Sequence, residues 1–319
     1  MPADPPGHGL SGRRRAMPRV HLDTDLGSDT DDLCALAMLL GWPEVTVTGV
    51  TTTTDPGGRR AGMTAWALGL AGRTEVPVAA GAEGTLASPM VPFEFPDYWP
   101  EPIRPRPARP GAALDLLAAA AEAGAIIVAV GPWTNLALLE AARPGLLGRA
   151  AVVLMGGHVP EARPGFPPVG PEDDFNVQQD HLAARIVLEA CDPLVVPLAA
   201  TNQVHLRAAH LPRLRAAGPL GALLADQAEA HARDQGVPEL GRAWPGLPDD
   251  LLNFQHDPLA CAVALGWDGV TTETIPTGLE AAGGRLRMTR SAGGRPLRVV
   301  TAVDGPGFEE RWLEAVERP

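Results

Sequence analysis

Five aspartates fall within ten consecutive positions near the N-terminus, in the segment VHLDTDLGSDTDD. They are Asp23, Asp25, Asp29, Asp31 and Asp32, and they lie where a β-type run ends and a helical run begins. Like charges at short range cannot all stay ionised unless a cation lies between them. Carboxylate oxygens are hard ligands that favour calcium or magnesium over zinc. The segment therefore predicts a site for a hard divalent cation.

Two simpler interpretations of the acidic segment explain less of it. Acids in the first turn of a helix complement its positive end, but this accounts for Asp31 and Asp32 alone. An EF-hand loop counted from Asp23 would need Gly at its sixth position and Glu at its twelfth, where this chain has Ser28 and Cys34. Metal binding remains the preferred interpretation.

The elements that must position these acids alternate between β-type and helical runs from Val20 onward. This alternation predicts an α/β fold, with a mostly parallel central sheet flanked by helices in a Rossmann-related single domain over 19–319. Residues 1–18 read as a disordered tail. The expected strands are Arg19–Leu22, Val45–Val50, Ile126–Val130, Ala151–Met155 and Leu194–Leu198. The expected helices are Asp31–Leu40, Arg59–Leu70, Ala112–Ala123, Asn135–Ala142 and His181–Glu189.

The second half of the chain and one long loop complete the outline. Ala209–Arg233 reads as helix, Thr271–Thr301 as β-hairpins, and Phe308–Glu317 as a last helix that follows a Gly-Pro-Gly breaker. Pro92–Pro110 is too rich in proline for a regular element, and two interpretations stay open for it. It either covers an active site or is a plain surface linker.

Composition excludes several classes of protein. The chain has 319 residues, a formal net charge of −12 and no lysine, which disfavours nucleic acid or an anionic membrane surface as its main partner. The three cysteines are far apart and support neither disulfides nor a zinc site. No apolar run is long enough to span a membrane, and the N-terminus does not read as a signal peptide. A cytoplasmic location is expected.

Five further segments share the order of landmarks in a known family. They are Val76-Pro77-Val78-Ala79-Ala80-Gly81, Gly131-Pro132-Trp133-Thr134-Asn135-Leu136-Ala137, Met155-Gly156-Gly157, Asp174-Phe175-Asn176 with Asp180, and His256-Asp257-Pro258-Leu259-Ala260. With the acidic segment, they make the chain resemble the inosine-uridine-preferring nucleoside hydrolases. The acidic segment has the longer form, with two extra residues before the paired aspartates.

The resemblance implies an enzyme that uses a calcium-bound water to hydrolyse the bond between ribose and a base. It implies a nucleoside substrate and a homo-oligomer, either dimer or tetramer. By position, the calcium ligands would be Asp25, Asp32, Asp257 and the main-chain carbonyl of Thr134. Asp25 would also take the proton from the attacking water.

The remaining implied roles concern the substrate. Asp31, Asp174 and Asn176 would bind ribose hydroxyls, and Asp29 competes with Asp31 because of the two-residue insertion. His256 would protonate the leaving base, because an imidazole with an ordinary pKa of about 6.5 can donate a proton at neutral pH. Asp174 and Asn176 could instead form a simple Asx turn.

Other histidines and aromatic residues receive lesser roles. His158 could line the pocket, His21 lies in the first strand, and four histidines are expected on helical or loop surfaces, namely His181, His205, His210 and His231. Phe175 reads as a packing anchor. Three aromatic residues are candidates to stack on a base, namely Trp133, Trp99 and Tyr98.

The chain departs from the family's pattern around the base and the sugar. A stretch with His-Gly is replaced by proline-rich sequence, which suggests that an anionic substrate group contacts Arg104, Arg106 or Arg109. An expected Asn after the second strand is absent, and Asp55 is its possible substitute. Gly165-Phe166-Pro167-Pro168 replaces a Gly-Asn pair, and Asp174 stands where a Glu is usual.

Two alternative functions remain open from the sequence. The first is a phosphatase of the haloacid-dehalogenase type, whose first strand also ends in Asp-x-Asp. The absence of lysine and the presence of Gly27 disfavour it. The second is a calcium-bound member of the hydrolase fold that binds a ligand without catalysis.

Overall fold

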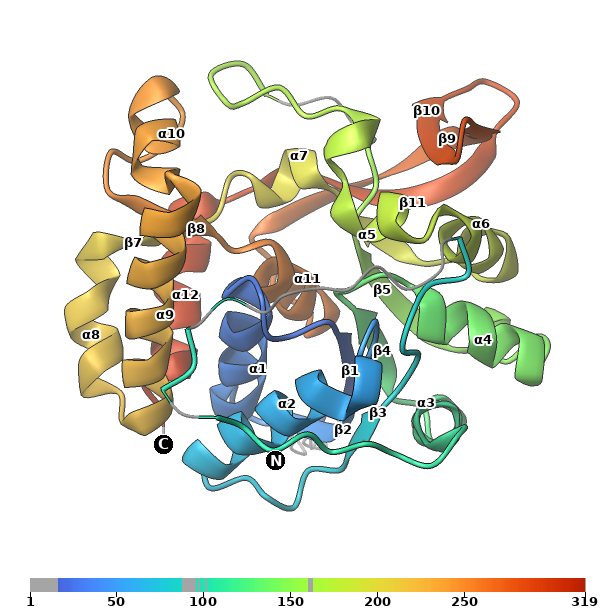
Figure 1. The fold of residues 1–319 in the computed structure, drawn as a ribbon. Helices are drawn as coiled ribbons and strands as arrows, with labels where there is room; N and C mark the ends of the chain where they lie inside the picture. The colour runs from blue at the N-terminus through green and yellow to red at the C-terminus, as the bar shows by residue number, and fades with distance from the viewer. Residues whose placement is uncertain (1–16, 88–95, 97, 101, 160–162, 319) are drawn as a thin grey trace, which may run out of the picture.

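The central feature of the computed structural model is a nine-stranded sheet (Figure 1). The structure describes residues 17–318 except 88–95, 97, 101 and 160–162. The strand order is β10-β9-β11-β6-β5-β4-β1-β2-β3. The bounds are β1 Arg19–Thr24, β2 Thr46–Thr52, β3 Val78–Ala80, β4 Ile126–Ala129, β5 Ala151–Met155, β6 Leu194–Val196, β9 Val270–Ala282, β10 Arg285–Arg290 and β11 Arg295–Val303.

The sheet is parallel from β3 through to β11, and only β9 and β10 run antiparallel to their neighbours. Strand β1 lies between β2 and β4, so the chain winds away from it in both directions. This reversal makes a crevice at the carboxyl end of β1, where ligands of such sheets bind. The acidic segment begins in β1 and leaves the sheet at that crevice.

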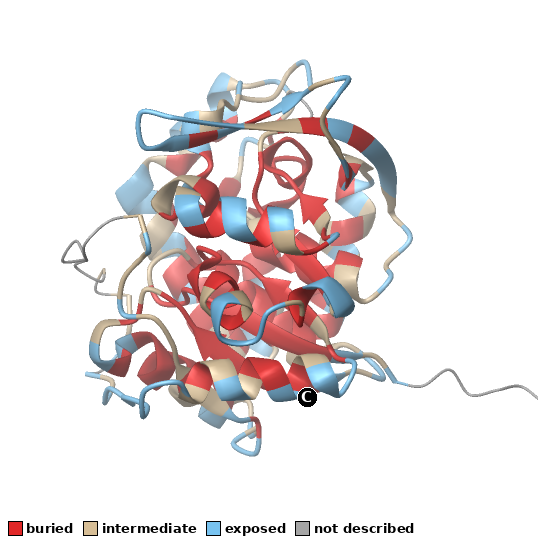
Figure 2. Ribbon diagram, turned by 90° about the vertical axis from the view of Figure 1, so that its right-hand side faces the viewer, coloured by how far each residue is buried: buried red, intermediate tan, exposed pale blue. Residues whose placement is uncertain are grey.

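Helices cover both faces of the sheet and create two apolar cores. One core lies beneath α1, α2, α11 and α12, with α8 and α9 packed outside, and the other lies beneath α3, α4 and α6. Figure 2 shows the buried residues concentrated in the strands and on the inner faces of these helices. The bounds are α1 Asp31–Gly41, α2 Arg59–Leu70, α3 Ala112–Glu122, α4 Thr134–Ala142, α5 Phe175–Gln179, α6 His181–Ala190, α7 Leu198–Thr201, α8 Leu211–Ala216, α9 Pro219–Gln235, α10 Val237–Ala243, α11 His256–Ala264 and α12 Gly305–Val316.

A separate two-stranded sheet lies beside the site end of the molecule. It pairs β7 (His205–Arg207) with β8 (Leu251–Phe254) in antiparallel register. The chain leaves β8 and enters α11 after a single residue, Gln255, whose amide donates to the carbonyl of Val204 at 3.0 Å. This small sheet therefore determines where α11 begins.

The α/β architecture is confirmed, and several element boundaries are corrected. Leu194–Leu198 is not one strand, because β6 ends before Pro197 and Leu198 already begins α7. Ala209–Arg233 divides into a short 3-10 turn, α8 and α9, since Gly218 interrupts it with a positive φ of 91°. The Gly-Pro-Gly sequence is not a breaker. Its proline lies in the first turn of α12, where the missing amide costs nothing.

Two sequence expectations concern the segments that the structure describes only in part. Residues 1–16 of the expected tail lie outside the described residues. The described part of Pro92–Pro110 contains no helix or strand, as expected. No helix among the described residues is long and apolar enough to cross a membrane.

The described part of the proline-rich segment packs on the start of α2 through glycines. The amide of Arg106 donates to the carbonyl of Gly58 at 2.8 Å. A Cβ at Gly58 would collide with the main chain of Arg106 and Pro107, and one at Gly62 would collide with the carbonyl of Arg104. Close contact between backbones therefore holds this segment against α2.

This packing gives a testable pair of substitutions. Gly57 and Gly58 both have positive φ, at 67° and 76°, but nothing lies within 4 Å of a Cβ placed on Gly57. Gly57→Ala should cost about 1–2 kcal/mol of unfolding free energy from backbone strain alone. Gly58→Ala should cost about 1–3 kcal/mol more because of the collision. Equal losses in urea denaturation would contradict this account.

Candidate active site

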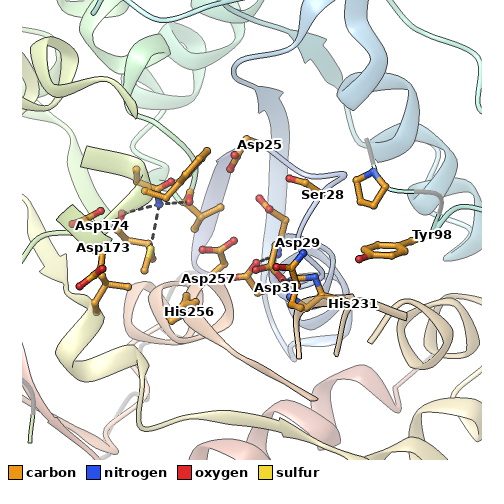
Figure 3. A pocket seen from close by; sticks show the side chains of 18 residues that line it. Asp25, Ser28, Asp29, Asp31, Tyr98, Asp173, Asp174, His231, His256 and Asp257 are labelled. Atoms are coloured by element: carbon orange, nitrogen blue, oxygen red, sulfur yellow. Dashed lines mark hydrogen bonds and ion pairs between the residues drawn. The ribbon is translucent and has the colours of Figure 1, made fainter. Parts of the chain in front are cut away.

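A cavity of about 640 Å³ opens at the carboxyl end of β1 and is strongly acidic (Figure 3). Among the described residues, its lining contains no arginine. The carboxylates that line it come from the β1–α1 loop and α1, from the start of α11, and from the segment before α5. They are Asp25, Asp29, Asp31 and Asp32, then Asp257, and then Asp173 and Asp174. The structure thus brings together acids that are more than 200 residues apart in the chain.

Hydrogen bonds inside the fold fix the loop that carries Asp25. The hydroxyl of Thr24 donates to the carboxylate of Asp32 and accepts from the amide of Leu26 at 3.2 Å. The guanidinium of the buried Arg60 donates to the carbonyls of Asp25 and Leu26. Its positive charge also counteracts the rise in the pKa of Asp25 that burial produces. Sequence reasoning did not single out Arg60.

Asp29 organises the entrance to α1. Its Oδ1 accepts from the amides of Thr30 at 2.5 Å and Asp31 at 3.4 Å, and from Nδ2 of Asn253 at 2.5 Å. The Asn253 side chain comes from β8, and its Nδ2 also lies 2.9 Å from Oγ1 of Thr30. Asn253 is therefore a further site residue that the sequence analysis missed, and it ties the acidic loop to the small sheet.

Three buried carboxylates form the tightest acidic group among the described residues. Asp31, Asp32 and Asp257 each offer an oxygen, and these oxygens all lie within 4.8 Å of one another. Burial raises the pKa of each of the three, and repulsion from neighbouring carboxylates raises it further. A hard divalent cation would relieve this repulsion and supply the missing positive charge, so the donor set fits calcium.

Asp25 lies in the same cavity but outside this compact group of three. Its charge nevertheless raises the pKa of Asp31, Asp32 and Asp257, so the four carboxylates form one electrostatic unit. The family resemblance predicts that Asp25 is a ligand of the ion and that Asp31 binds ribose hydroxyls. The structure places Asp31, in its present side-chain conformation, with the two acids assigned to the ion.

Asp174 lies in the wall of the cavity (Figure 3). Asn176 also lines the cavity, near the carboxyl ends of β4 and β5. Asp174 caps α5 by accepting from the amide of Val177 at 3.1 Å, and it also accepts from the amide of Gly157. Burial raises its pKa to about 6. Nδ2 of Asn176 donates to the carbonyls of Val130 at 2.6 Å and Met155 at 3.2 Å. Its amide oxygen is then the group left for a ligand.

His256 begins α11 and lines the cavity next to Asp257. Its Nδ1 lies 2.6 Å from Oγ1 of Thr201, and its ring packs against Phe254 with centroids 5.3 Å apart. Burial lowers its pKa to about 4, below the ordinary value on which the sequence expectation relied. The ring is therefore neutral at neutral pH in the ligand-free protein, where it can donate a hydrogen bond through one nitrogen.

Three other predicted site residues do not line this cavity in the structure. Thr134 is the first residue of α4, and its hydroxyl donates to the buried carboxylate of Asp180 at 2.7 Å. Asp55 lines a second cavity of about 300 Å³ and accepts from the amides of Arg60 and Ala61 at 2.7 and 3.0 Å, which fixes the start of α2. His158 is half-buried outside the lining.

Several aromatic and histidine residues differ from expectation. Phe175 is not a packing anchor, because it is 55% exposed and lines the cavity. Trp133 is fully buried core and Trp99 packs against Trp66, which leaves Tyr98 as the one of the three stacking candidates that lines the cavity.

Three of the four histidines expected on the surface are also placed differently. His205 and His210 are buried, and His231 of α9 lines the cavity with its ring 6.2 Å from that of Tyr98. Tyr98 and Pro96 bring the proline-rich segment to the cavity edge, so this segment is more than a linker.

The arginines of the proline-rich segment do not support the proposed contact with an anionic substrate group. None of Arg104, Arg106 and Arg109 lines the acidic cavity. Arg109 instead pairs with Asp115 at 2.5 Å on the surface and borders the second cavity. Two side chains that do line the acidic cavity, His231 and Gln235 of α9, were not assigned any role from the sequence.

Comparison with known proteins decides the family. The family model described as inosine-uridine preferring nucleoside hydrolase matches residues 20–310. The chain belongs to this family. Relatives of this chain align with it over different shares of their own length.

Two relatives and one solved structure illustrate the similarity. An uncharacterized protein of Schizosaccharomyces pombe is 32% identical over 212 residues, which cover 62% of this chain and 66% of that protein. The pyrimidine-specific ribonucleoside hydrolase RihA of Salmonella typhimurium is 29% identical over 325 aligned residues, covering 95% of this chain and 99% of RihA. The structure of a purine-preferring ribonucleoside hydrolase from Gardnerella vaginalis has a TM-score of 0.75 at 23% identity, covering 94% of this chain and 98% of that one. It shows the shared fold.

This chain is thus an enzyme of the nucleoside hydrolase family, with a buried acidic group that fits a metal ion. The family assignment removes the phosphatase alternative. The expected dimer or tetramer and the cytoplasmic location stay predictions.

The repulsion within the acidic group gives a prediction for stability without metal. In the presence of a chelator, Asp31→Asn should raise the melting temperature by about 2–4 °C per kcal/mol of repulsion removed. Calcium should abolish or reverse this gain, because the ion already compensates the charge. Asp268→Asn, a change at an exposed acid, serves as the control. A melting temperature that Asp31→Asn lowers equally with and without calcium would contradict the repulsion.

Proposed function

We propose that this nucleoside hydrolase cleaves the N-glycosidic bond of a ribonucleoside to give ribose and free base, with calcium as cofactor. The observation that carries the proposal is the compact group of Asp31, Asp32 and Asp257 in the lining of a cavity large enough for a nucleoside. The family membership and the nucleoside hydrolases among its relatives support it.

The proposed ion ligands are Asp25, Asp32, Asp257 and the carbonyl of Thr134, and Asp31 turns to the sugar when the ion binds. A calcium ion held there would position the attacking water and make it more acidic. Asp25 accepts the proton of that water, because a carboxylate base is still needed where acidification is modest. Its position beside Asp32 and Asp257 in the electrostatic unit supports this role.

The sugar is bound by carboxylate and amide side chains of the cavity. Asp31, Asp174 and the amide oxygen of Asn176 accept from ribose hydroxyls, and Asp29 supports the main chain of the acidic loop rather than competing for this role. Carboxylates around the ring stabilise the positive charge that develops on the sugar as the bond breaks.

Bond cleavage leaves an electron pair on the base nitrogen. The C1′–N bond breaks as the water oxygen bonds to C1′, and one proton of the water passes to Asp25. As negative charge develops on the departing base, the His256 ring takes up a proton from solvent, passes it to the base nitrogen and returns to its neutral form. Asp25 then releases the proton of the water to solvent, so the protons balance.

The central experiment measures released reducing sugar and phosphate from a panel of purine and pyrimidine nucleosides and one phosphate ester. We expect sugar release that a chelator stops and calcium restores. Asp25→Asn should lower kcat by at least about 10³-fold while the protein stays folded by circular dichroism. Absence of sugar release from every nucleoside with calcium bound, measured by calorimetry, would support the non-catalytic alternative instead.

The charge of the cavity predicts which substrates are excluded. Uridine and inosine should be hydrolysed with kcat/KM at least about 100-fold above their 5′-monophosphates, because each like-charge contact costs several kcal/mol and 1.4 kcal/mol is a factor of ten. No arginine in the described lining can pair with the phosphate. Comparable rates for nucleoside and nucleotide would show that an anionic group is accommodated.

A further inference from the structure

A row of aromatic rings connects the small sheet to His256. His205 of β7 and Phe254 of β8 are directly opposite each other in the antiparallel pair, with ring centroids 5.9 Å apart. The Phe254 ring then lies over the His256 ring at a centroid distance of 5.3 Å and an interplanar angle of 27°. Side chains opposite each other on paired strands stabilise each other's position.

The far end of this row is firmly anchored. His205 is 6% exposed, and its Nε2 lies 3.0 Å from the carbonyl of Asn202. Its Nδ1 lies 3.3 Å from Oε1 of Glu309, which α12 supplies. Phe166 stacks on His205 at 6.4 Å, with an interplanar angle of 12°. Both ring nitrogens of His205 thus face an acceptor, and the ring has little freedom to turn.

His256 needs this support because its hydrogen bond to Thr201 involves only Nδ1. A hydrogen bond at one ring nitrogen fixes one edge of the imidazole but not the plane of the ring. The stacked face of Phe254 supplies that second restraint, from an element with no part in the acidic group.

We propose that Phe254, held in place by His205, is a positioning residue that sets the plane of the His256 ring toward the departing base. The inference rests on the proposed function. When the C1′–N bond breaks, its electron pair goes to the base nitrogen, and the ring must be in line to donate there. A leaving group that is stable as an anion does not need this donation.

The test compares two ribosides that differ in their need for a donor. One is uridine or inosine, whichever the parent protein hydrolyses faster, and the other is 4-nitrophenyl β-D-ribofuranoside, whose phenolate leaves unassisted. Phe254→Leu should lower kcat for the nucleoside about 10- to 100-fold. It should change kcat for the aryl riboside by less than about threefold. Phe254→Tyr, which keeps the ring face, should restore the nucleoside rate.

Two controls separate positioning from general damage. Trp267→Leu removes another aromatic contact, with Phe308 at 5.4 Å and away from the cavity, and should leave the ratio of the two rates unchanged. In a His256→Ala background, Phe254→Leu should no longer change that ratio.

The outcomes distinguish the inference from the function on which it rests. Equal loss on both substrates with Phe254→Leu, or a selective loss that persists without His256, would overturn the positioning role while the hydrolase function stands. No sugar release from either substrate by the calcium-loaded parent protein would overturn both.

Discussion

Mutual repulsion among four buried carboxylates is the constraint around which this structure is built. Asp25, Asp31, Asp32 and Asp257 each have a raised pKa, because burial and like charges both disfavour their ionised forms. Such a group costs folding free energy unless positive charge compensates it, and the buried Arg60 does so only in part, because the pKa values of Asp25 and Asp32 stay raised. The same concentration of negative charge that makes the ion-free site unfavourable suits the proposed reaction, in which positive charge develops on the sugar.

The surrounding scaffold holds the acids in place and compensates their charge only in part, through the buried Arg60. Arg60 binds main-chain carbonyls of the acidic loop, Thr24 and Asn253 bind side chains within it, and Asp180 links the start of α4 to α6. These contacts act mainly on the backbone and on carboxylates at the edge of the group. The scaffold, rather than an ion, therefore places the main chain of the acidic loop.

The sequence was sufficient to predict the part of the site that follows from sheet topology. An acidic segment after the first strand of a doubly wound sheet must lie at its crevice, so the pattern alone could place its aspartates there, whereas their individual roles came only from the family resemblance. The strands β7 and β8 are too short to show an alternation of apolar and polar residues, so their pairing could not be predicted from the sequence. Because this pairing could not be predicted, the burial of His205 and the roles of Asn253 and Phe254 could not be predicted either. Phe175 was misjudged because an exposed phenylalanine looks like a core residue in sequence.

The nine-stranded sheet and the small sheet both shape the cavity, and α11 joins their contributions because it carries Asp257 and the neighbouring His256. The nine-stranded sheet contributes the loops that follow β1, β4 and β5, and Asn176 donates to the carbonyls of Val130 and Met155 at the ends of β4 and β5. The small sheet contributes ring contacts from His205 and Phe254 that reach His256. The energy of ring contacts changes little when the charge in the site changes, whereas the pKa values and conformations of the acids depend strongly on that charge. Under the proposed function, a cation that turns Asp31 toward the sugar would therefore leave the stacked ring of His256 in place.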